Sequence, residues 1–470
     1  MRRLLGSLTA VAAGALVAAP ACGLFFEERA PTGGGDPGGG GTGGASVGFL
    51  CEDVIVRDGE TWVHSFAGAS LFDLRVDGAA ITFVGRATAN TDGGLPGLKG
   101  DGDHFFIATA ARNGCDIEVQ DLGSGYDADD TIRLSHGSGI INAVWTRGAA
   151  LCAGDPSTLE GATETGCPGG ATVACSVDAG RLRGASVAET QGGTIVSYFR
   201  DENAGTVTCN GVMDNATTLG TRLFLTATQK FKGLGGRNQG ARMATLLGGD
   251  VIVTSLCPSI LGTPPGNGAQ EACGAAGMPG FVMVGAFLRP NAAYALDSAE
   301  SPLSGAIQPL GSESTIVPST FGAGYVRVGD AGRRLLGWGE IDGGAPGEAL
   351  MTAVGQPLIL RSAEAPASSK QQVLAGISHA SIGNLDCPSN PCTPFAFWLA
   401  VDGNDSYGRA YTTTNGVGLS AANAAAISGD RIIVGGEFRD GALSVEGLTT
   451  RIEVGTQNAL FLANVPNTAP

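Results

Sequence analysis

Three acidic clusters hold the side chains whose type and spacing could do chemistry in this chain. They contain Asp101 and Asp103 in "GDGDH", Asp127 and Asp129 in "DADD", and Asp402 in "DGNDSYG". Closely spaced carboxylates are the oxygen ligands that calcium prefers, and two of them with different pKa values could act as acid and base on a polysaccharide. In the third cluster Tyr407 and Thr413 stand where an EF-hand needs Gly and Glu. The plainer interpretation is solvated turn carboxylates, with no catalytic and no metal residue assigned and calcium as the alternative.

Histidine adds little further chemistry. The chain has four, at His64, His104, His136 and His379. None belongs to an H-E-x-x-H or C-x-x-C pattern, so the sequence does not support a structural zinc site. His136 lies in "LSHGSG", and we expect it to be a turn histidine exposed to water. A catalytic triad cannot be assembled from the sequence, because its members come from different loops.

Eleven cysteines leave one over if the others form five disulfides, as expected in an exported protein. Cys387 and Cys392 flank a turn that contains Pro and Asn, and we predict that they pair. Cys257 and Cys273 bracket a loop with Pro and Gly, and we predict that they pair as well. Six more cysteines, from Cys51 to Cys209, allow many pairings, and the spacing does not choose among them.

The N-terminal stretch "MRRLLGSLTAVAAGALVAAPAC" has the three parts of a secretory signal, predicted over residues 1–21. Two arginines form the basic region, an apolar region follows, and A-P-A provides a small-residue cleavage site. The segment resembles a bacterial lipoprotein signal, in which the cysteine after the cut receives a diacylglyceryl thioether, with palmitate as the expected fatty acid. Cys22 stands at that position, although Ala19 replaces the usual Leu. Cleavage by an ordinary signal peptidase, giving a periplasmic or secreted protein, is the alternative.

We predict that the segment after the signal forms a flexible tether. Residues 22–46 combine the lipidated cysteine with a glycine-rich stretch that has few side chains with which to build a core. Such a chain is flexible and spans about 27 Å on average, enough to hold a folded domain away from lipid headgroups. Gly23, rather than Asp, follows Cys22, and by the same resemblance this implies an outer-membrane or cell-surface location.

From residue 47 to 470 the chain repeats short apolar runs that predict β-strands. Clear examples are "HFFIATA" (104–110), "FAFWLAV" (395–401) and "ALFLANV" (459–465), each with an earlier run in its unit, and we also pair "RRLLGWGE" (333–340) with "PLILRSA" (357–363). Taking Phe105 and Phe461 as equivalent positions gives units of about 59 residues. We predict an all-β fold, a single β-propeller of about seven four-stranded blades, because closure leaves little strand edge exposed. Tandem β-sandwiches or a β-helix are the alternatives.

The first unit, "WVHSFAGASLFDLRVDGAAITFVGRATAN…DHFFIATAARNG", resembles the bacterial SBBP-type β-propeller repeat family. The matching positions are Trp62, Phe66, Gly68, Val76, Asp77, Gly85, Phe105 and Ala108. The last unit is similar, whereas the middle units depart from the pattern. The resemblance implies architecture and no particular activity, since functions are carried by sites and not by folds.

The net charge of the chain narrows the classes of partner that it could bind. The net charge of −16 disfavours nucleic acid as a partner, because an acidic surface repels phosphates. We expect an exported envelope protein, held on the membrane by its N-terminal lipid, that serves as a non-catalytic binding or scaffolding module for a protein or glycan. The alternatives are an exported polysaccharide hydrolase or lyase that uses Asp101, Asp103, Asp127 or Asp129, and a structural envelope component.

Overall fold

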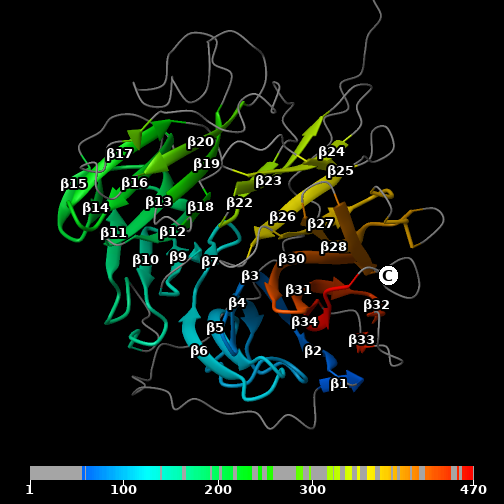
Figure 1. Cartoon of the computed structure of the whole chain (residues 1–470). Coiled ribbons are helices and arrows are strands. Elements are labelled where there is room, and N and C mark those ends of the chain that lie inside the picture. The colour runs from blue at the N-terminus through cyan, green and yellow to red at the C-terminus, as the bar shows by residue number, and fades with distance from the viewer. Residues whose placement is uncertain are drawn as a thin grey trace, which may run out of the picture. The chain divides into compact units, whose positions relative to one another are not determined.

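The computed structural model describes residues in the second of two units of the chain, residues 40–470. The described residues are 55–58, 60–137, 140–160, 166–190, 193–200, 204–214, 220–235, 242–245, 251–257, 282–288, 296–297, 315–320, 322–328, 334–340, 347–349, 357–365, 371–382, 385–388, 392–402, 405–411, 419–445, 452–454 and 458–468. Among these residues every regular element is a β-strand and none is a helix (Figure 1). The predicted all-β class is confirmed.

Four sheets come from the first part of the described chain, and we number all sheets in the chain order of the first strand named for each. Sheet 1 comprises β3 (Ala69–Asp77), β4 (Ala80–Thr88), β5 (Asp103–Ala111) and β6 (Glu118–Ser124). Sheet 2 comprises β7 (Ile132–Leu134), β9 (Ala143–Arg147), β10 (Ala150–Gly154), β11 (Val173–Val177), β14 (Val207–Cys209) and β15 (Val212–Asp214). Sheet 3 comprises β12 (Arg183–Thr190), β13 (Gly193–Arg200), β16 (Gly220–Leu225) and β17 (Lys230–Gly235). Sheet 4 comprises β18 (Arg242–Thr245), β19 (Val251–Cys257), β20 (Val282–Leu288) and β21 (Leu296–Asp297), with the short β8 (His136–Gly137) added in parallel to β18.

Three further sheets complete the set, with one small hairpin beside them. Sheet 5 comprises β22 (Thr315–Pro318), β23 (Gly322–Val328), β24 (Arg334–Glu340) and β25 (Gly347–Ala349). Sheet 6 comprises β26 (Leu358–Glu364), β27 (Gln372–Ser378), β28 (Phe395–Asp402) and β29 (Asp405–Tyr411). Sheet 7 comprises β30 (Leu419–Ser428), β31 (Arg431–Arg439) and β34 (Ala459–Pro466) together with β2 (Thr61–Ala67) and β1 (Ile55–Asp58). The hairpin consists of β32 (Gly441–Leu443) and β33 (Ile452–Val454).

Consecutive sheets pack against one another through their first strands. We call β3, β7, β12, β18, β22, β26 and β30 the inner strands; contacts between neighbouring sheets include β3 with β7, β12 with β18, β22 with β26, and β30 with β3. Six apolar clusters lie between neighbouring sheets, such as the one in which Leu71, Phe83 and Ile433 meet between sheets 7 and 1. A succession of small antiparallel sheets that bury apolar faces against their neighbours is the β-propeller type of architecture.

The sheet boundaries correct one part of the repeat prediction. "RRLLGWGE" forms β24, the third strand of sheet 5, whereas "PLILRSA" lies mainly in β26, the inner strand of sheet 6. The two runs therefore do not share a unit. Both runs are apolar and short, and a local pattern does not reveal which strand begins a sheet.

In two places a segment joins a sheet whose other strands are not adjacent to it in the chain. The early strand β2 pairs with β34 near the C-terminal end of the described residues, with Trp62 opposite Asn464. The β14–β15 hairpin leaves sheet 3 between β13 and β16 and pairs with β11 of sheet 2. There Cys175 lies directly opposite Cys209, and the two form a disulfide. Neighbouring sheets are thus tied by backbone pairing and a covalent bond.

A shared packing arrangement recurs in sheets 1, 6 and 7. In each sheet the inner strand carries a β-bulge, and a glycine of the second strand lies against it. A phenylalanine of the third strand covers the glycine; the pairs are Gly85–Phe106, Gly376–Phe397 and Gly436–Phe461. A Cβ atom at these glycines would come 1.9–2.0 Å from a backbone carbonyl oxygen of the inner strand. No other residue fits there, because close backbone approach leaves no room for a side chain.

Two further disulfides in the described residues join cysteines that are close in the chain. Cys152 pairs with Cys167, and Cys387 pairs with Cys392, the latter being the pair predicted from the turn between them. Cys115 is also disulfide-bonded. The predicted partner of Cys257, Cys273, lies outside the described residues, as do Cys22, the signal segment and the tether.

Candidate functional site

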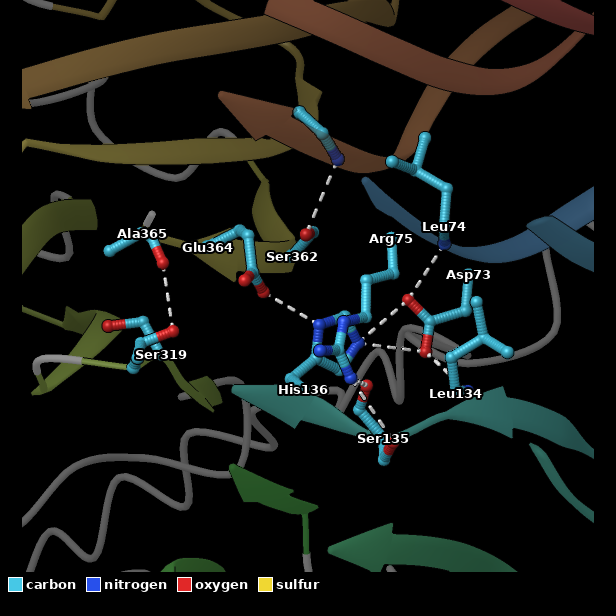
Figure 2. Close-up of polar contacts among 12 residues, drawn as sticks. Asp73, Leu74, Arg75, Leu134, Ser135, His136, Ser319, Ser362, Glu364 and Ala365 are labelled. Carbon is cyan, nitrogen blue, oxygen red and sulfur yellow. Dashed lines mark hydrogen bonds and ion pairs between the residues drawn. The ribbon is translucent and has the colours of Figure 1, made fainter. Parts of the chain in front are cut away.

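One cluster of charged side chains in the described core comes from strands of three sheets. Asp73 and Arg75 lie on β3, His136 lies on β8, and Glu364 closes β26 (Figure 2). His136 reaches this place because the segment after β7 runs beside β18, where His136 pairs with Ala244. Side chains separated by more than two hundred positions in the chain therefore meet.

His136 is held between two carboxylates, as Figure 2 shows. Its Nε2 lies 3.0 Å from both oxygens of Asp73, and its Nδ1 lies 2.6 Å from Oε2 of Glu364. The backbone N–H groups of Leu74 and Leu134 each donate to Asp73 at 3.0 Å. Because both ring nitrogens face carboxylate oxygens, the arrangement favours the doubly protonated imidazolium.

The electrostatics of this Asp73–His136–Glu364 chain agree with its geometry. Burial opposes the charge of His136, but the charges of Asp73 and Glu364 and the hydrogen bonds to both raise its pKa to about 10. Burial likewise opposes the charge of Asp73, yet the neighbouring His136 holds the pKa of that carboxyl below its usual range. His136 is consequently a cation at neutral pH and a poor general base.

Arg75 supports the segment that carries His136. Its guanidinium is buried, and Nη1 donates to the backbone oxygen of Ser135 at 3.1 Å. Burial lowers the pKa of Arg75, while the nearby charges of Glu364 and Asp77 act in the opposite direction. The segment around His136 is therefore held from β3 by both an ion pair and a charged hydrogen bond.

A small cavity of about 20 Å³ lies on the side of His136 where Asp73 is found. Three arginines from three sheets line it: Arg133 on β7, Arg242 on β18 and Arg361 on β26. Nη1 of Arg242 donates to the backbone oxygen of Arg361 at 2.6 Å. Burial lowers the pKa of Arg242 well below its usual value, and the charges of Arg133 and Arg361 lower it further, whereas Asp73 raises it.

A larger cleft of about 340 Å³ lies on the opposite side of His136, where Glu364 is found. Its charged lining residues are Arg75, Asp77, Arg112 and Glu364, and its remaining lining includes Thr320 and the turn that ends β30. A guanidinium nitrogen of Arg112 donates to the backbone oxygen of Ser428, which fixes that turn beside the cleft. The cleft is large enough for a small ligand and offers it hydrogen-bonding groups of both charges.

The acidic clusters singled out in the sequence lie elsewhere. Asp103 accepts two hydrogen bonds from Arg86, and Asp127 and Asp129 form surface ion pairs with Arg181 at 2.5 Å and Arg183 at 3.1 Å. Asp101 accepts a long contact from Asn90, and Asp402 lies in the β28–β29 hairpin. None of these five aspartates lines the cavity or the cleft.

Within the described part of the chain, no three His, Cys, Asp or Glu side chains converge as a metal ion requires. No helix suited to crossing a membrane occurs among the same residues.

The prediction for His136 is wrong, because its side chain is only 16% exposed and makes two ion pairs. The turn composition around it resembles that of a surface loop, but the loop folds inward. One signal was present in the sequence: Asp73 and Arg75 stand two residues apart inside the apolar run "LFDLRVD". Alternation along a strand places such a pair on one face, and charges there need partners from another part of the fold.

No protein-family model matches the sequence, and no curated protein matches it significantly. Solved structures with detectable similarity include the β-propeller domain of the trilobed protease from Pyrococcus furiosus, with 8% identity over 85% of this chain and 98% of that chain and a TM-score of 0.39. The endosialidase of phage phi92 shares 10% identity over 87% of this chain and 70% of its own, with a TM-score of 0.36. The Trypanosoma rangeli sialidase in complex with sialic acid shares 10% identity over 90% of this chain and 59% of its own, with a TM-score of 0.30. Because these TM-scores lie below 0.5, the similarities carry no argument about this chain.

Proposed function

We propose that this chain is an exported, lipid-anchored binding module whose ligand, a glycan or a protein segment, occupies the cleft beside Glu364. The observation that carries the proposal is the cleft itself, which lies at the ends of inner strands from several sheets. Propeller folds place ligand sites where their sheets converge, because loops and strand ends of several blades meet there.

The proposed architecture is a closed ring of seven blades, with sheets 1 to 7 as the blades. It is supported by the contacts of each inner strand with its neighbours in chain order, which continue from β30 back to β3. The pairing of β2 with β34 supplies the closing strand within sheet 7. Such closure leaves few strand edges open to other chains.

A binding role fits the chemistry of the site better than catalysis does. His136 holds its proton tightly between two carboxylates and lacks the pKa of a general base near neutral pH. A hydrolase or lyase would use Asp101, Asp103, Asp127 or Asp129. The last three of these are engaged with surface arginines, and Asp101 contacts Asn90. A purely structural envelope component remains the third candidate and would leave the cleft without a ligand.

We expect Asp77→Ala to weaken ligand binding about tenfold, since a charged hydrogen bond in such a site contributes on the order of one to two kcal/mol. Asp77 is exposed at the end of β3, so the fold tolerates the change. The experiment applies the fluorescently labelled full chain to an array of acidic and neutral oligosaccharides and charged peptides. The affinity for the array member that binds most strongly is then measured for each protein.

Asp92→Ala serves as the matched control, because Asp92 is exposed in a loop and does not line the cleft. Equal binding by both variants would place the ligand elsewhere. Cleavage of an array member would favour the hydrolase or lyase, and the absence of any bound probe would favour the structural component.

The anchor is proposed from the cysteine at position 22 and the glycine-rich segment after it. In a diderm bacterial host we expect Cys22→Ser to move the protein from the outer-membrane fraction to the soluble periplasmic or secreted fraction. Mass spectrometry of the N-terminal peptide from the unaltered protein should show an acylated cysteine. An unmodified N-terminus, with equal fractionation of both forms, would contradict the anchor and support ordinary signal-peptidase cleavage.

A further inference from the structure

We propose that the cleft beside Glu364 binds a neutral glycan, whose hydroxyl groups form hydrogen bonds with a carboxylate and a guanidinium of the lining. This inference names the ligand class of the proposed function and rests on that function. The two side chains are those of Asp77, at the end of β3, and Arg112, directly after β5. Both keep hydrogen-bonding capacity that the described fold does not use.

The carboxylates of the cleft supply free acceptors. Asp77 is exposed, and its charge acts on Arg75. Within the described part of the chain, however, its carboxylate oxygens accept no hydrogen bond. Glu364 adds one more acceptor, because its Oε2 faces His136 at 2.6 Å while no described donor reaches its Oε1. A ligand in the cleft therefore meets oxygens that can still accept protons.

Arg112 supplies the donors. One guanidinium nitrogen donates to the backbone oxygen of Ser428, and the same nitrogen lies 3.8 Å from an oxygen of Asp430, beyond hydrogen-bond distance. A guanidinium carries several N–H groups in a fixed fork, so donors remain for a ligand. The side chain of Arg112 is 41% exposed, which makes these donors accessible from the cleft.

Hydroxyl groups match this combination, because one hydroxyl oxygen both donates and accepts. Neighbouring hydroxyls of a sugar ring can donate to Asp77 and accept from Arg112 at the same time. An anionic ligand would gain Arg112 but meet the charge of Asp77, and a cationic ligand would meet the reverse. Like charges brought together oppose binding, so a neutral polyhydroxyl ligand satisfies the cleft best.

The apolar part of the lining favours a glycan over a protein segment. It consists of Val76, Ala365, Ala426 and Ile427, and the last three are buried and expose little surface. None of the described lining residues is aromatic. Protein segments are commonly held by an aromatic or apolar anchor in a well-packed pocket, at a place where charged residues are depleted. This cleft has charged side chains instead of such a pocket.

Oligosaccharide pairs that differ in charge test the ligand class with the purified full chain. One pair is N-acetylchitohexaose and its cationic deacetylated form, and another is methyl-esterified oligogalacturonate and its anionic free acid. Cellohexaose and mannohexaose, each with a carboxylated derivative, extend the panel. Isothermal titration calorimetry measures each affinity. We expect the neutral member of the best-bound pair to bind at least about tenfold more tightly than its charged counterpart, since like charges in the cleft oppose binding.

Two variants should change this selectivity in opposite directions. Asp77→Asn keeps an acceptor but removes the negative charge, so it should raise the affinity for the carboxylated or free-acid member about tenfold. Arg112→Gln removes the positive charge and should raise the affinity for deacetylated chitohexaose to a similar extent. Asp92→Asn is the matched control, because Asp92 is exposed in a loop and does not line the cleft, and it should leave every affinity ratio unchanged.

The possible failures of the two proposals can be told apart. A charged member that binds more tightly than its neutral counterpart, with binding weakened by Asp77→Ala, would overturn the neutral glycan and keep the cleft as the ligand site. A panel without binding would also overturn the neutral glycan, while a charged peptide bound through Asp77 would keep the proposed function. Binding of a neutral oligosaccharide that Asp77→Ala leaves unchanged would overturn both proposals.

Discussion

His136→Gln is expected to lower the free energy of unfolding at pH 7 by about 3–5 kcal/mol. The neutral amide leaves Asp73 and Glu364 facing each other without the cation that bridges them. Removing one member of a buried ion pair leaves an uncompensated charge, and the cost is larger than the net value of the pair. The positive charge of Arg75 still attracts Glu364, and the charges of Arg133 and Arg242 still attract Asp73. These attractions offset part of the loss in stability.

The same histidine should make stability depend on pH in the alkaline range. In the folded protein its pKa is raised to about 10, whereas in the unfolded chain it is near 6.5. Between these values the folded state binds more protons, so stability is complete below about pH 6.5 and falls as pH rises toward 10. We expect the wild-type protein to lose a few kcal/mol over this window and His136→Gln to lose less.

Guanidinium chloride denaturation at pH 6.5, 8 and 9.5, with the disulfides intact, measures both effects. His104, paired with Asp121, also has a raised pKa and contributes a slope of the same sign in every variant. His379→Gln is the matched control, because burial lowers the pKa of His379 and its titration affects stability only below about pH 6.5. Equal alkaline slopes for wild type and His136→Gln would show that His136 is not held as an imidazolium.

Asp214→Ala is expected to cost about 3–5 kcal/mol of stability. Asp214 lies on β15 of sheet 2, while its partners Arg222 and Tyr198 lie on β16 and β13 of sheet 3. Arg222 donates to both oxygens of Asp214, at 2.9 and 2.6 Å, and the Tyr198 hydroxyl donates at 3.1 Å. Exposure of the two charged side chains is only 7% and 2%. The substitution therefore takes the carboxylate away from a buried guanidinium and removes a link between two sheets.

A double variant separates these causes. Asp214→Ala with Arg222→Met should recover part of the loss, because removing both members of a buried pair leaves no unpaired charge. Asp127→Ala, which breaks the exposed pair with Arg181, should change stability by about 1 kcal/mol or less. Denaturation midpoints compare the four proteins. A double variant no more stable than Asp214→Ala alone would show that the buried charge of Arg222 is not the source of the loss.

The sequence alone predicted the strands and the all-β class correctly, because alternation and apolar runs are local consequences of burying one face of a strand. "HFFIATA" and "ALFLANV" form β5 and β34 for that reason. The bond between Cys387 and Cys392 was equally local, since five positions and a turn separate the two cysteines.

Tertiary structure alone decided which strands share a sheet and which charges meet. Nothing local separates "PLILRSA" from "RRLLGWGE", and nothing near β2 in the chain indicates that β34 is its partner. His136 looked like a surface residue because its neighbours are turn formers, yet Glu364 lies 228 positions away from it in the chain and 2.6 Å away in space. Periodicity reports whether a side chain is buried, whereas the identity of its partner depends on how whole sheets pack.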